Sequence, residues 1–379
     1  MRIAVLTTGR QDWGILRSTC LLLRDRPGFE LLVLAGGMCC EPRFGAVLAH
    51  LEQDGISPVE RMRWVGELAD APVHLQSGDA LRLIGDALAR HRPDALLLVG
   101  DRFETAAAAL AATLARVPIV HLHGGEETAG AFDNALRHAI TKLAHLHLVS
   151  HVDHARRVIA MGEDPASVHV VGAPGLDNVH RTDLAERAEL EQFLGISLQP
   201  PVVLVTHHPA TLGAAPEQEI DAVIATMDRV DATYVVTLPN ADPGSAAIRE
   251  RLVAAVNHPR RKAAEALGER RYFGLLRLAD AMLGNSSSGL IEAPLLGLPV
   301  VNVGDRQKGR LREANVLDAP PDADAITARL TDALAPGFRA GLTGRGSALG
   351  DGHAAERIVD ILAAWHPPVP PIKPPVRIA

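Results

Sequence analysis

The sequence predicts an α/β chain that contains two doubly wound parallel sheets. The first observation is a series of short apolar runs, most of them followed by a stretch with helical spacing. This alternation is typical of parallel β/α units whose helices cover both faces of a sheet. The second observation is that the series starts again at residue 200, and the third is a length of 379 residues, which favours two domains.

The elements follow in order along each half. In the first half the expected strands are 2–6 (RIAVL), 30–35 (ELLVLA), 95–100 (ALLLVG), 117–125 (VPIVHLHGG), 145–150 (HLHLVS) and 168–175 (VHVVGAPG). In the second half they are 200–209 (PPVVLVTHHP), 232–240 (ATYVVTLPN), 280–285 (DAMLGN) and 298–305 (LPVVNVGD). Helices are predicted between them, most clearly at 104–116 and 134–145. The first of these is so rich in alanine that its buried face must pack closely.

The boundary between the two domains is expected within 170–183, where Gly, Pro and Asn suit a linker better than a core element. We therefore expect an N-terminal domain over 1–175 and a C-terminal domain over 176–366. The remaining tail, 367–379, is rich in proline and can be neither helix nor central strand. It is expected to be an extended strap or disordered.

Composition excludes several classes of function. A formal net charge of −7 argues against a nucleic-acid binder that relies on a basic field, and 3% aromatic residues leave little for base stacking. Three cysteines do not suggest a disulfide framework in a chain of this size. The first apolar run is too short for a signal-peptide core, and no run is long enough to span a bilayer. A cytoplasmic protein without nucleic-acid or membrane partners is expected.

Chemistry-bearing residues follow the strands, where open α/β sheets bind ligands. In TTGRQDWG (7–14), Arg10 stands at a glycine turn where a phosphate could sit; alternatively, Asp12 simply helps to start a helix. In VGDRFE (99–104), Asp101 ends a strand and could be only a helix N-cap. Arg102 and Glu104 add more charge at the same position than a cap requires.

The densest stretch is 117–142. His121 and His123 alternate at a strand end, Glu126 and Glu127 follow a double glycine, and Asp133 and Arg137 stand at i, i+4 on the next helix; that pair could be only a helix salt bridge. His123 and Glu126 match no strong metal-site template. Carboxylates and imidazoles gathered after one strand, beside Asp101, are better explained as acid/base groups with separated pKa values.

In the second half, His207 and His208 point to opposite sides if the strand continues, so at most one is expected to face a ligand. The stretch 284–294 (GNSSSGLIEAP) places Ser286, Ser287, Ser288 and Gly289 between a strand and a helix start. These residues could hold a diphosphate, with Glu292 accepting ribose hydroxyls, or they could form a plain helix cap. No Walker lysine follows, which disfavours ATP hydrolysis. The basic residues of 302–316 form either a solvated loop or a second electropositive wall.

Together these stretches resemble the hydrolysing UDP-N-acetylglucosamine 2-epimerases of sialic and legionaminic acid synthesis. The matching motifs, in family order over most of the chain, are TTGRQDWGIL, VGDRFE, HLHGGEETAGAFDNALRHAITKLAHLH, GAPGLDN, THHPAT, GNSSSGLIEAP and GDRQKGRLREANV. The resemblance implies two Rossmann-like domains in a GT-B-like arrangement, with the nucleotide-sugar in the interdomain cleft. It also implies anti-elimination of UDP, then hydration of a glycal, with neither NAD nor metal, in a homodimer or homotetramer.

Residue by residue, the resemblance implies that Asp101 and Asp133 transfer protons at C2, with either His123 or Glu126 as a third acid/base group. The remaining implied contacts are His208, which matches a catalytic histidine, and the substrate-binding residues Arg10, Arg102, Arg137, Ser286, Ser287, Ser288, Gly289 and Glu292.

The chain departs from the family pattern in two places. Cys39-Cys40 stand where many relatives have a histidine after Gly-Met, and Asn134 stands where another carboxylate is usual. UDP-GlcNAc is the expected substrate, and UDP-2,4-diacetamido-2,4,6-trideoxyglucose is the alternative. A non-hydrolysing epimerase, a GT-B glycosyltransferase and a non-catalytic sensor are rival functions.

Overall fold

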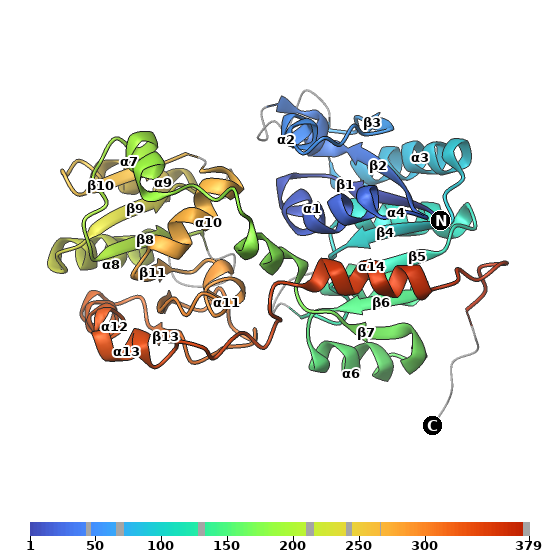
Figure 1. The fold of residues 1–379 in the computed structure, drawn as a ribbon. Helices are drawn as coiled ribbons and strands as arrows, with labels where there is room; N and C mark the ends of the chain where they lie inside the picture. The colour runs from blue at the N-terminus through green and yellow to red at the C-terminus, as the bar shows by residue number, and fades with distance from the viewer. Residues whose placement is uncertain are drawn as a thin grey trace. The chain divides into compact units, whose positions relative to one another are not determined.

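The computed structural model describes residues 1–42, 47–65, 72–127, 133–209, 216–239, 245–265 and 267–373. Within these residues the chain forms two compact units (Figure 1). Unit 1 contains the described residues up to 177 together with 352–373, and unit 2 contains those between 178 and 351. In the described parts of the chain, no helix is long and apolar enough to cross a membrane.

Unit 1 is built around a parallel sheet. Its described strands are β1 Arg2–Thr7, β2 Glu30–Gly36, β3 Glu60–Met62, β4 Ala95–Val99, β5 Ile119–Leu122, β6 Leu146–Val149 and β7 Val168–Val170. Its described α-helices are α1 Arg10–Asp25, α2 Val47–Gln53, α3 Val73–His91, α4 Phe103–Leu114, α5 Asp133–Leu143, α6 Val152–Ala160 and α14 Ala354–Ala364. The strand order is β3-β2-β1-β4-β5-β6-β7, and every pair is parallel.

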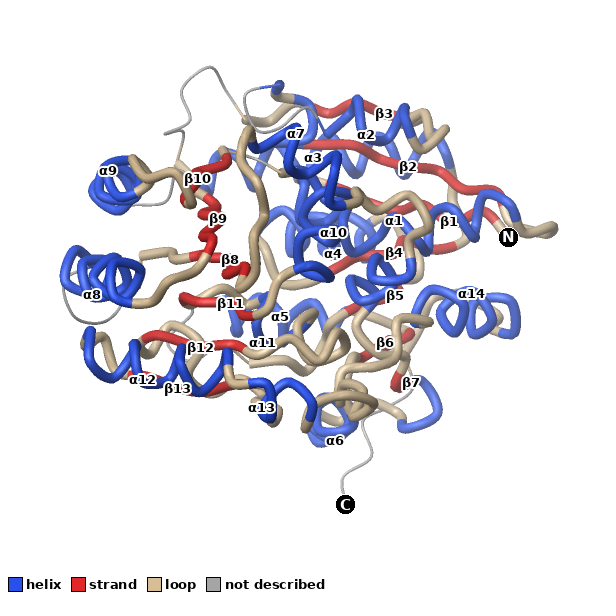
Figure 2. The backbone as a smooth tube through the Cα atoms, turned by 60° about the vertical axis from the view of Figure 1, so that its left-hand side comes forward, coloured by secondary structure: helices blue, strands red, loops and turns tan. Residues whose placement is uncertain are grey.

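The core of unit 1 follows from the two-residue period of its strands. Ile3 and Val5 of β1 pack with α1 and α14 on one face, and Ala4 and Leu6 pack with α3 and α4 on the other. Both sets are buried, as expected for a parallel sheet covered on both faces. Figure 2 shows helices on both sides of these strands. The alanines of α4 are buried as predicted and allow close packing on its neighbours.

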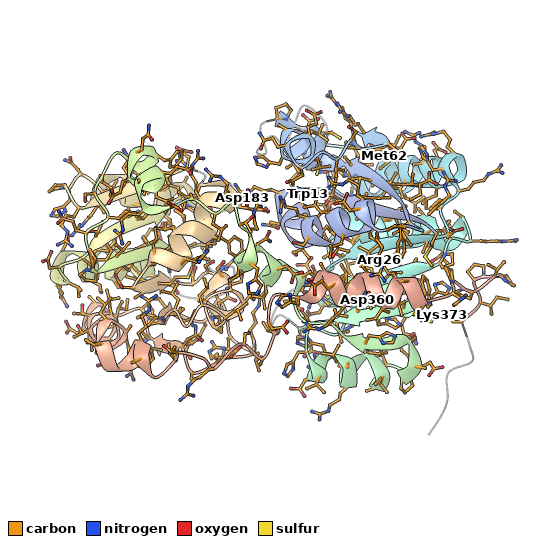
Figure 3. The ribbon with its side chains drawn as sticks, in the orientation of Figure 1. Trp13, Arg26, Met62, Asp183, Asp360 and Lys373 are labelled. Atoms are coloured by element: carbon orange, nitrogen blue, oxygen red, sulfur yellow. The ribbon has the colours of Figure 1, made fainter. Side chains whose placement is uncertain are left out.

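The last helix belongs to unit 1, although the expected C-terminal domain ran to residue 366. In α14, Ile358, Val359 and Leu362 are buried in the same core as β1 and α1. Arg26, at the end of α1, pairs with Asp360 at 2.5 Å (Figure 3). The apolar face of α14 therefore completes unit 1 by a long-range contact that sequence order does not reveal.

The proline-rich tail is non-helical where it is described, up to residue 373, and it lies along α5 and β6. Lys373 donates to the Lys142 carbonyl oxygen at 2.8 Å and pairs with the buried Glu163. His145 Nε2 is 3.3 Å from the Pro371 carbonyl oxygen. These contacts match an extended strap; residues 374–379 lie outside the described chain.

Unit 2 repeats the architecture. Its described strands are β8 Val202–Thr206, β9 Thr233–Thr237, β10 Arg261–Ala264, β11 Ala281–Gly284, β12 Val300–Val303 and β13 Val316–Ala319. Its described α-helices are α7 Arg187–Leu194, α8 Pro216–Arg229, α9 Ser245–Ala255, α10 Gly268–Leu278, α11 Ser288–Ile291, α12 Ala323–Leu334 and α13 Pro336–Ala340. The strand order is β10-β9-β8-β11-β12-β13, again parallel throughout.

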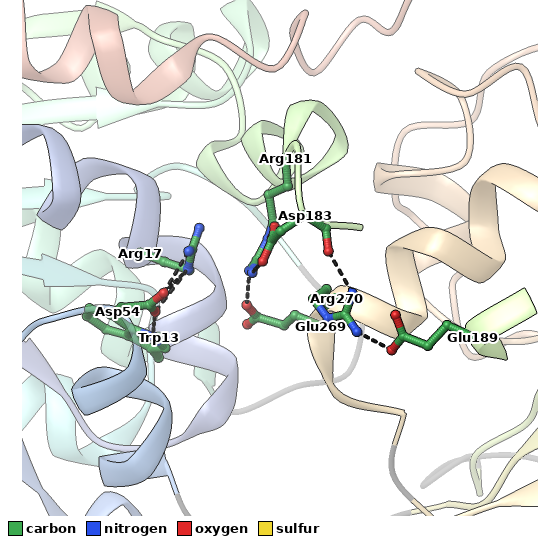
Figure 4. Close-up of polar contacts among 8 residues, drawn as sticks. All are labelled: Trp13, Arg17, Asp54, Arg181, Asp183, Glu189, Glu269 and Arg270. Carbon is green, nitrogen blue, oxygen red and sulfur yellow. Dashed lines mark hydrogen bonds and ion pairs between the residues drawn. The ribbon is translucent and has the colours of Figure 1, made fainter. Parts of the chain in front are cut away.

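Polar networks anchor helices and loops within each unit (Figure 4). In unit 1, Asp54 accepts from the Trp13 indole at 3.1 Å and pairs with Arg17, which fastens the end of α2 to α1. In unit 2, Arg181 pairs with Asp183 at 2.8 Å and with Glu269 on α10 at 3.5 Å. The segment that enters unit 2 is thereby fixed to α10.

Each sheet has one point where the strand order reverses: between β1 and β4 in unit 1, and between β8 and β11 in unit 2. Ligands of open α/β sheets bind beyond the carboxyl ends of the strands at this point. The motifs that begin at residues 7 and 99 lie at this point of unit 1, and those that begin at 206 and 284 lie at this point of unit 2. The fold thus brings together, within each unit, segments about 80 to 90 residues apart in sequence.

Candidate active site

The turn after β1 is held by Asp12. Its Oδ2 accepts from the Thr8 amide at 2.8 Å and from the Thr8 hydroxyl at 2.6 Å. Burial raises the pKa of Asp12, although these bonds work against the shift. Asp12 therefore helps to start α1, one of the two expected alternatives, while the Arg10 side chain at the helix start is exposed.

Asp101 does not cap α4. The residue at the N-cap position is Arg102, which makes no side-chain cap bond, and Asp101 instead forms an ion pair with Arg137 of α5. Only 7% of the Arg137 side chain is exposed, and its Nε has no hydrogen-bond partner among the described residues. Arg137 thus makes an ion pair between two elements, where a helix salt bridge with Asp133 was one of the alternatives.

Asp133 begins α5, close to Asp101. Burial and the Asp101 charge raise the pKa of Asp133, while Arg137 and Arg102 oppose the shift. A raised pKa favours the protonated form of a carboxyl group, which suits it to act as an acid. The two carboxylates therefore differ in environment: Asp101 is in an ion pair, and the pKa of Asp133 is raised.

A second ion pair lies beside this cluster. Arg102 donates to both carboxylate oxygens of Glu104, at 2.8 and 3.1 Å, and Glu104 is 1% exposed. Burial acts to lower the pKa of Arg102, but its bonds and ion pair with Glu104 raise it overall. Arg102 is consequently a fixed cation next to Asp12 and Asp101.

The two histidines after β5 have different surroundings. His121 is fully buried, with Nε2 2.8 Å from the Gly100 carbonyl oxygen, and burial lowers its pKa to about 3. It is a neutral structural link between β4 and β5. His123 Nδ1 contacts Glu126 Oε1 at 2.6 Å, and Glu126 also accepts from the Ser150 hydroxyl at 2.7 Å. Residues 128–132 of this motif lie outside the described chain.

In unit 2, Asn285 fixes the backbone of His208, the second residue after β8. Its amide accepts from the His208 backbone N–H and donates to the His208 carbonyl oxygen, both at 2.8 Å. His207 is fully buried 3.3 Å from Glu219, whereas His208 is partly exposed. The structure thus confirms that one of the two histidines is structural. The end of this motif, 210–211, lies outside the described residues.

The serine cluster follows β11 directly. Gly284 has φ of +132°, and a Cβ there would lie 2.0 Å from the Thr206 carbonyl oxygen, so only glycine allows this close approach of β11 to β8. The helix that follows, α11, has only four residues, and Ser287 makes no side-chain cap bond. Ser286 Oγ accepts from the Ser288 amide at 3.3 Å, so one of the three serines makes a local bond at the helix start while Ser287 makes none.

Side chains from three segments surround the cluster. Tyr272 of α10 is partly buried next to Glu292; burial raises its pKa, while bonds with Ser286 and Ser288 oppose the shift. Burial raises the pKa of Glu292, against a bond from Ser288, and its Oε2 has no hydrogen-bond partner among the described residues. Gly289, by contrast, packs against Val300.

The loop that follows β12 contacts Asn285 and lies near Glu292, on either side of the serine cluster in sequence. Gln307 and Arg306 donate to the Asn285 carbonyl oxygen at 2.8 and 3.0 Å, and the Arg310 charge acts on Glu292. This loop is therefore packed on the serine cluster instead of being only solvated, and it brings positive charge to a cluster of hydroxyls.

Known proteins match the chain closely. A family model described as UDP-N-acetylglucosamine 2-epimerase matches residues 22–363. The UDP-N,N′-diacetylbacillosamine 2-epimerase (hydrolyzing) of Legionella pneumophila is 34% identical over 378 residues, with 95% of each chain covered. The GDP/UDP-N,N′-diacetylbacillosamine 2-epimerase (hydrolyzing) of Campylobacter jejuni is 32% identical over 332 residues, with 84% of each covered.

This chain belongs to the UDP-N-acetylglucosamine 2-epimerase family. Among solved structures, the Neisseria meningitidis UDP-GlcNAc 2-epimerase bound to UDP-GlcNAc aligns with a TM-score of 0.76 at 18% identity, covering 96% of this chain and 100% of that one. The expected family and fold class, two Rossmann-like α/β units of the GT-B type, are confirmed.

Sequence reasoning missed several residues that hold the candidate site. Asn285, Tyr272 and Gln307 hold the serine cluster, and Ser150 holds Glu126. Asn285 had a signal, because an amide directly after a strand end often fixes a neighbouring backbone. The sequence carried no signal for Tyr272 or Ser150, because each belongs to a different element from the motif that it contacts. The Cys39 thiol, at the departure from the family pattern, is buried next to Thr7, and burial raises its pKa to about 12.

Proposed function

We propose that this epimerase is hydrolysing: it converts a UDP-2-acetamido sugar and water into UDP and a free manno-configured sugar. The observation that carries the proposal is the pair of unlike carboxylates, Asp101 and Asp133, gathered beyond β4 at the start of α5. Asp101 is paired with Arg137, and the pKa of Asp133 is raised. The two relatives named as hydrolysing support the release of UDP.

The chemistry needs proton transfer on both faces of the sugar carbon C2. In the first half-reaction the proton leaves C2, its electron pair forms the C1=C2 bond, and the C1–O pair departs with UDP. In the second, water adds hydroxide to C1 of the glycal, and C2 receives a proton on the opposite face. Asp133 is suited to supply that proton, because burial and the Asp101 charge raise its pKa and so favour the protonated carboxyl group.

The nucleotide end of the substrate is assigned to the serine cluster. Ser286, Ser287 and Ser288 offer hydroxyls, and Arg306 and Arg310 bring positive charge to the same place. These are groups that bind a diphosphate. Glu292, with one unpartnered carboxylate oxygen, is suited to accept from ribose hydroxyls.

We propose UDP-N,N′-diacetylbacillosamine, the 2,4-diacetamido-2,4,6-trideoxy sugar, as the preferred substrate ahead of UDP-GlcNAc. The support is the relative from Legionella pneumophila, which is named for this sugar and covers 95% of the chain. UDP-GlcNAc is the second candidate, supported by the family model.

Proton NMR of the purified protein with each UDP-sugar in D2O tests the proposal. The expected products are free UDP and a manno-configured sugar with deuterium at C2. An intact UDP moiety in the epimerised product would show a non-hydrolysing enzyme. Faster consumption of UDP-GlcNAc would reverse the order of the two substrates. If neither sugar changes, the hydrolysing assignment is wrong.

A further inference from the structure

His123 has the features of a group built for proton transfer. Its Nδ1 contacts the Glu126 carboxylate at 2.6 Å, so in the neutral ring the proton belongs on Nδ1 and the lone pair on Nε2. Nε2 is buried and has no hydrogen-bond partner among the described residues. Other buried ring nitrogens of the described chain, such as Nδ1 of His147 and His207, also have no partner. The Nε2 of His123 is therefore distinguished by its position after β5 and by the contact of its ring with Glu126.

The backbone at His123 supports the same interpretation. Its φ of +62° lies in the left-handed region, which a residue with a Cβ adopts at a cost of about 1 kcal/mol or more. The His123 amide donates to the Leu148 carbonyl oxygen at 3.2 Å, so β6 holds the residue in this conformation. Strain of this kind is concentrated at functional sites because the surrounding structure must maintain it.

Glu126 is a poor candidate for the base itself. Burial acts to raise its pKa, but the charge and hydrogen bond of His123 and the bond from Ser150 lower it well below its usual range. His154 adds a further positive influence 4.0 Å away. A carboxylate stabilised in this way accepts protons weakly, but it orients an imidazole well.

His123 also stands at the correct edge of the sheet. Val99 and Leu122 are paired in register at the ends of β4 and β5, and the Gly100 amide donates to the Leu122 carbonyl oxygen at 3.1 Å. Asp101 is the second residue after Val99, and His123 is the first residue after Leu122. The imidazole therefore lies at the same strand ends as the carboxylate cluster.

We propose that Nε2 of His123 removes the proton from C2 in the elimination step, and that Glu126 is the positioning residue that orients it. The inference rests on the proposed hydrolysing function and divides its two half-reactions between two groups. His123 takes the C2 proton while the C1–O bond breaks, and it later releases that proton to solvent. Asp133 gives its own proton to C2 of the glycal, and it regains one from the water whose hydroxide adds to C1.

The test separates the two half-reactions. His123→Asn suits the left-handed backbone and keeps an amide donor for Glu126, but it lacks Nε2. With the UDP-sugar that the wild-type protein turns over, we expect kcat for UDP release to fall by at least about 100-fold. The affinity for UDP should stay within threefold of wild type. With the matching 2-acetamidoglycal plus UDP, the same variant should hydrate the glycal within threefold of wild type. Asp133→Asn should show the reverse pattern and accumulate glycal.

A matched control is His91→Gln, because His91 forms another histidine–glutamate pair in unit 1, 2.8 Å from Glu60. It should leave both half-reactions within threefold of wild type. Glu126→Gln should lower kcat for UDP release by about tenfold with KM unchanged, which a purely structural loss would not produce. A changed ¹⁵N shift of His123 in this variant would locate the effect at the ring.

The possible failures are distinguishable. If His123→Asn releases UDP within threefold of wild type, or loses glycal hydration equally, the assignment of His123 is wrong while the proposed function stands. If the wild-type protein neither releases UDP nor hydrates the glycal, the proposed function itself fails. Loss of only the first half-reaction supports the assignment.

Discussion

Replacing Glu163 with glutamine should destabilise unit 1 by about 3 kcal/mol near neutral pH. Glu163 is almost fully buried, and it contacts Lys142 at 2.5 Å and His147 at 3.0 Å as well as Lys373 of the tail. Burial acts to raise its pKa, but these three partners lower it from 4.5 to about 2. The difference between these two pKa values, roughly 2.5 units, corresponds to about 3 kcal/mol of the free energy of unfolding.

The pH dependence has a definite sign. The pKa of Glu163 is lower in the folded protein than in the unfolded chain, so the stabilisation is fully present above pH 4.5 and is lost as pH falls towards 2. The stability difference between wild type and Glu163→Gln should therefore shrink to about half by pH 3.

Urea unfolding followed by tryptophan fluorescence measures this difference for unit 1 alone. All three tryptophans of the chain, Trp13, Trp64 and Trp365, lie in that unit. Glu30→Gln is the matched control, because its ion pair with Arg2 is exposed and should contribute less than about 1 kcal/mol. A Glu163→Gln effect below 1 kcal/mol at pH 7, or an equal effect at pH 7 and pH 3, would refute the reasoning.

Three further outcomes follow from the site. Asp101→Asn should lower kcat for UDP release by about 100-fold or more with UDP affinity little changed, whereas Asp133→Asn should lower the rate of glycal hydration by about 100-fold or more; a rate within threefold of wild type would remove that residue from the mechanism. Ser287→Ala should weaken UDP binding by about 1 kcal/mol in calorimetry, and an unchanged Kd would count against the serine site. Gly284→Ala should destabilise unit 2 by about 3 kcal/mol or more, seen as faster amide hydrogen exchange in β8 and β11, because its Cβ would meet the Thr206 carbonyl oxygen.

Most of the sheet strands could be predicted, and the misses share a physical cause. Every predicted apolar run corresponds to a described strand, whereas β3, β10 and β13 were not predicted. Each of these three is an edge strand. An edge strand buries less of its surface, so it needs no continuous apolar run, as Glu60–Met62 and Arg261–Ala264 illustrate.

The candidate site divides in a similar way. Residues directly after strands, such as Asp101, His123 and Ser287, could be found from the pattern, because the ends of parallel strands are where such folds bind ligands. The residues that contact them could not be predicted from the pattern. For Arg137 the pattern left open either a pair with Asp133 along its own helix or a contact to the substrate, and it did not reveal the ion pair with Asp101. Whether a carboxylate is an acid, a base or a positioning group depends on such neighbours.

By itself, the sequence determined the fold class and the strand-end positions of the candidate site, because hydrophobic period and turn residues act over short distances. It also determined the family, because the motifs occur in the family's order along the chain. Only the tertiary structure decided that α14 closes unit 1, that His121 is structural while His123 Nε2 stays unpartnered, and that Asp133 has a raised pKa. The physical reason is that burial, desolvation and ion pairing are set by atoms brought together from distant parts of the chain.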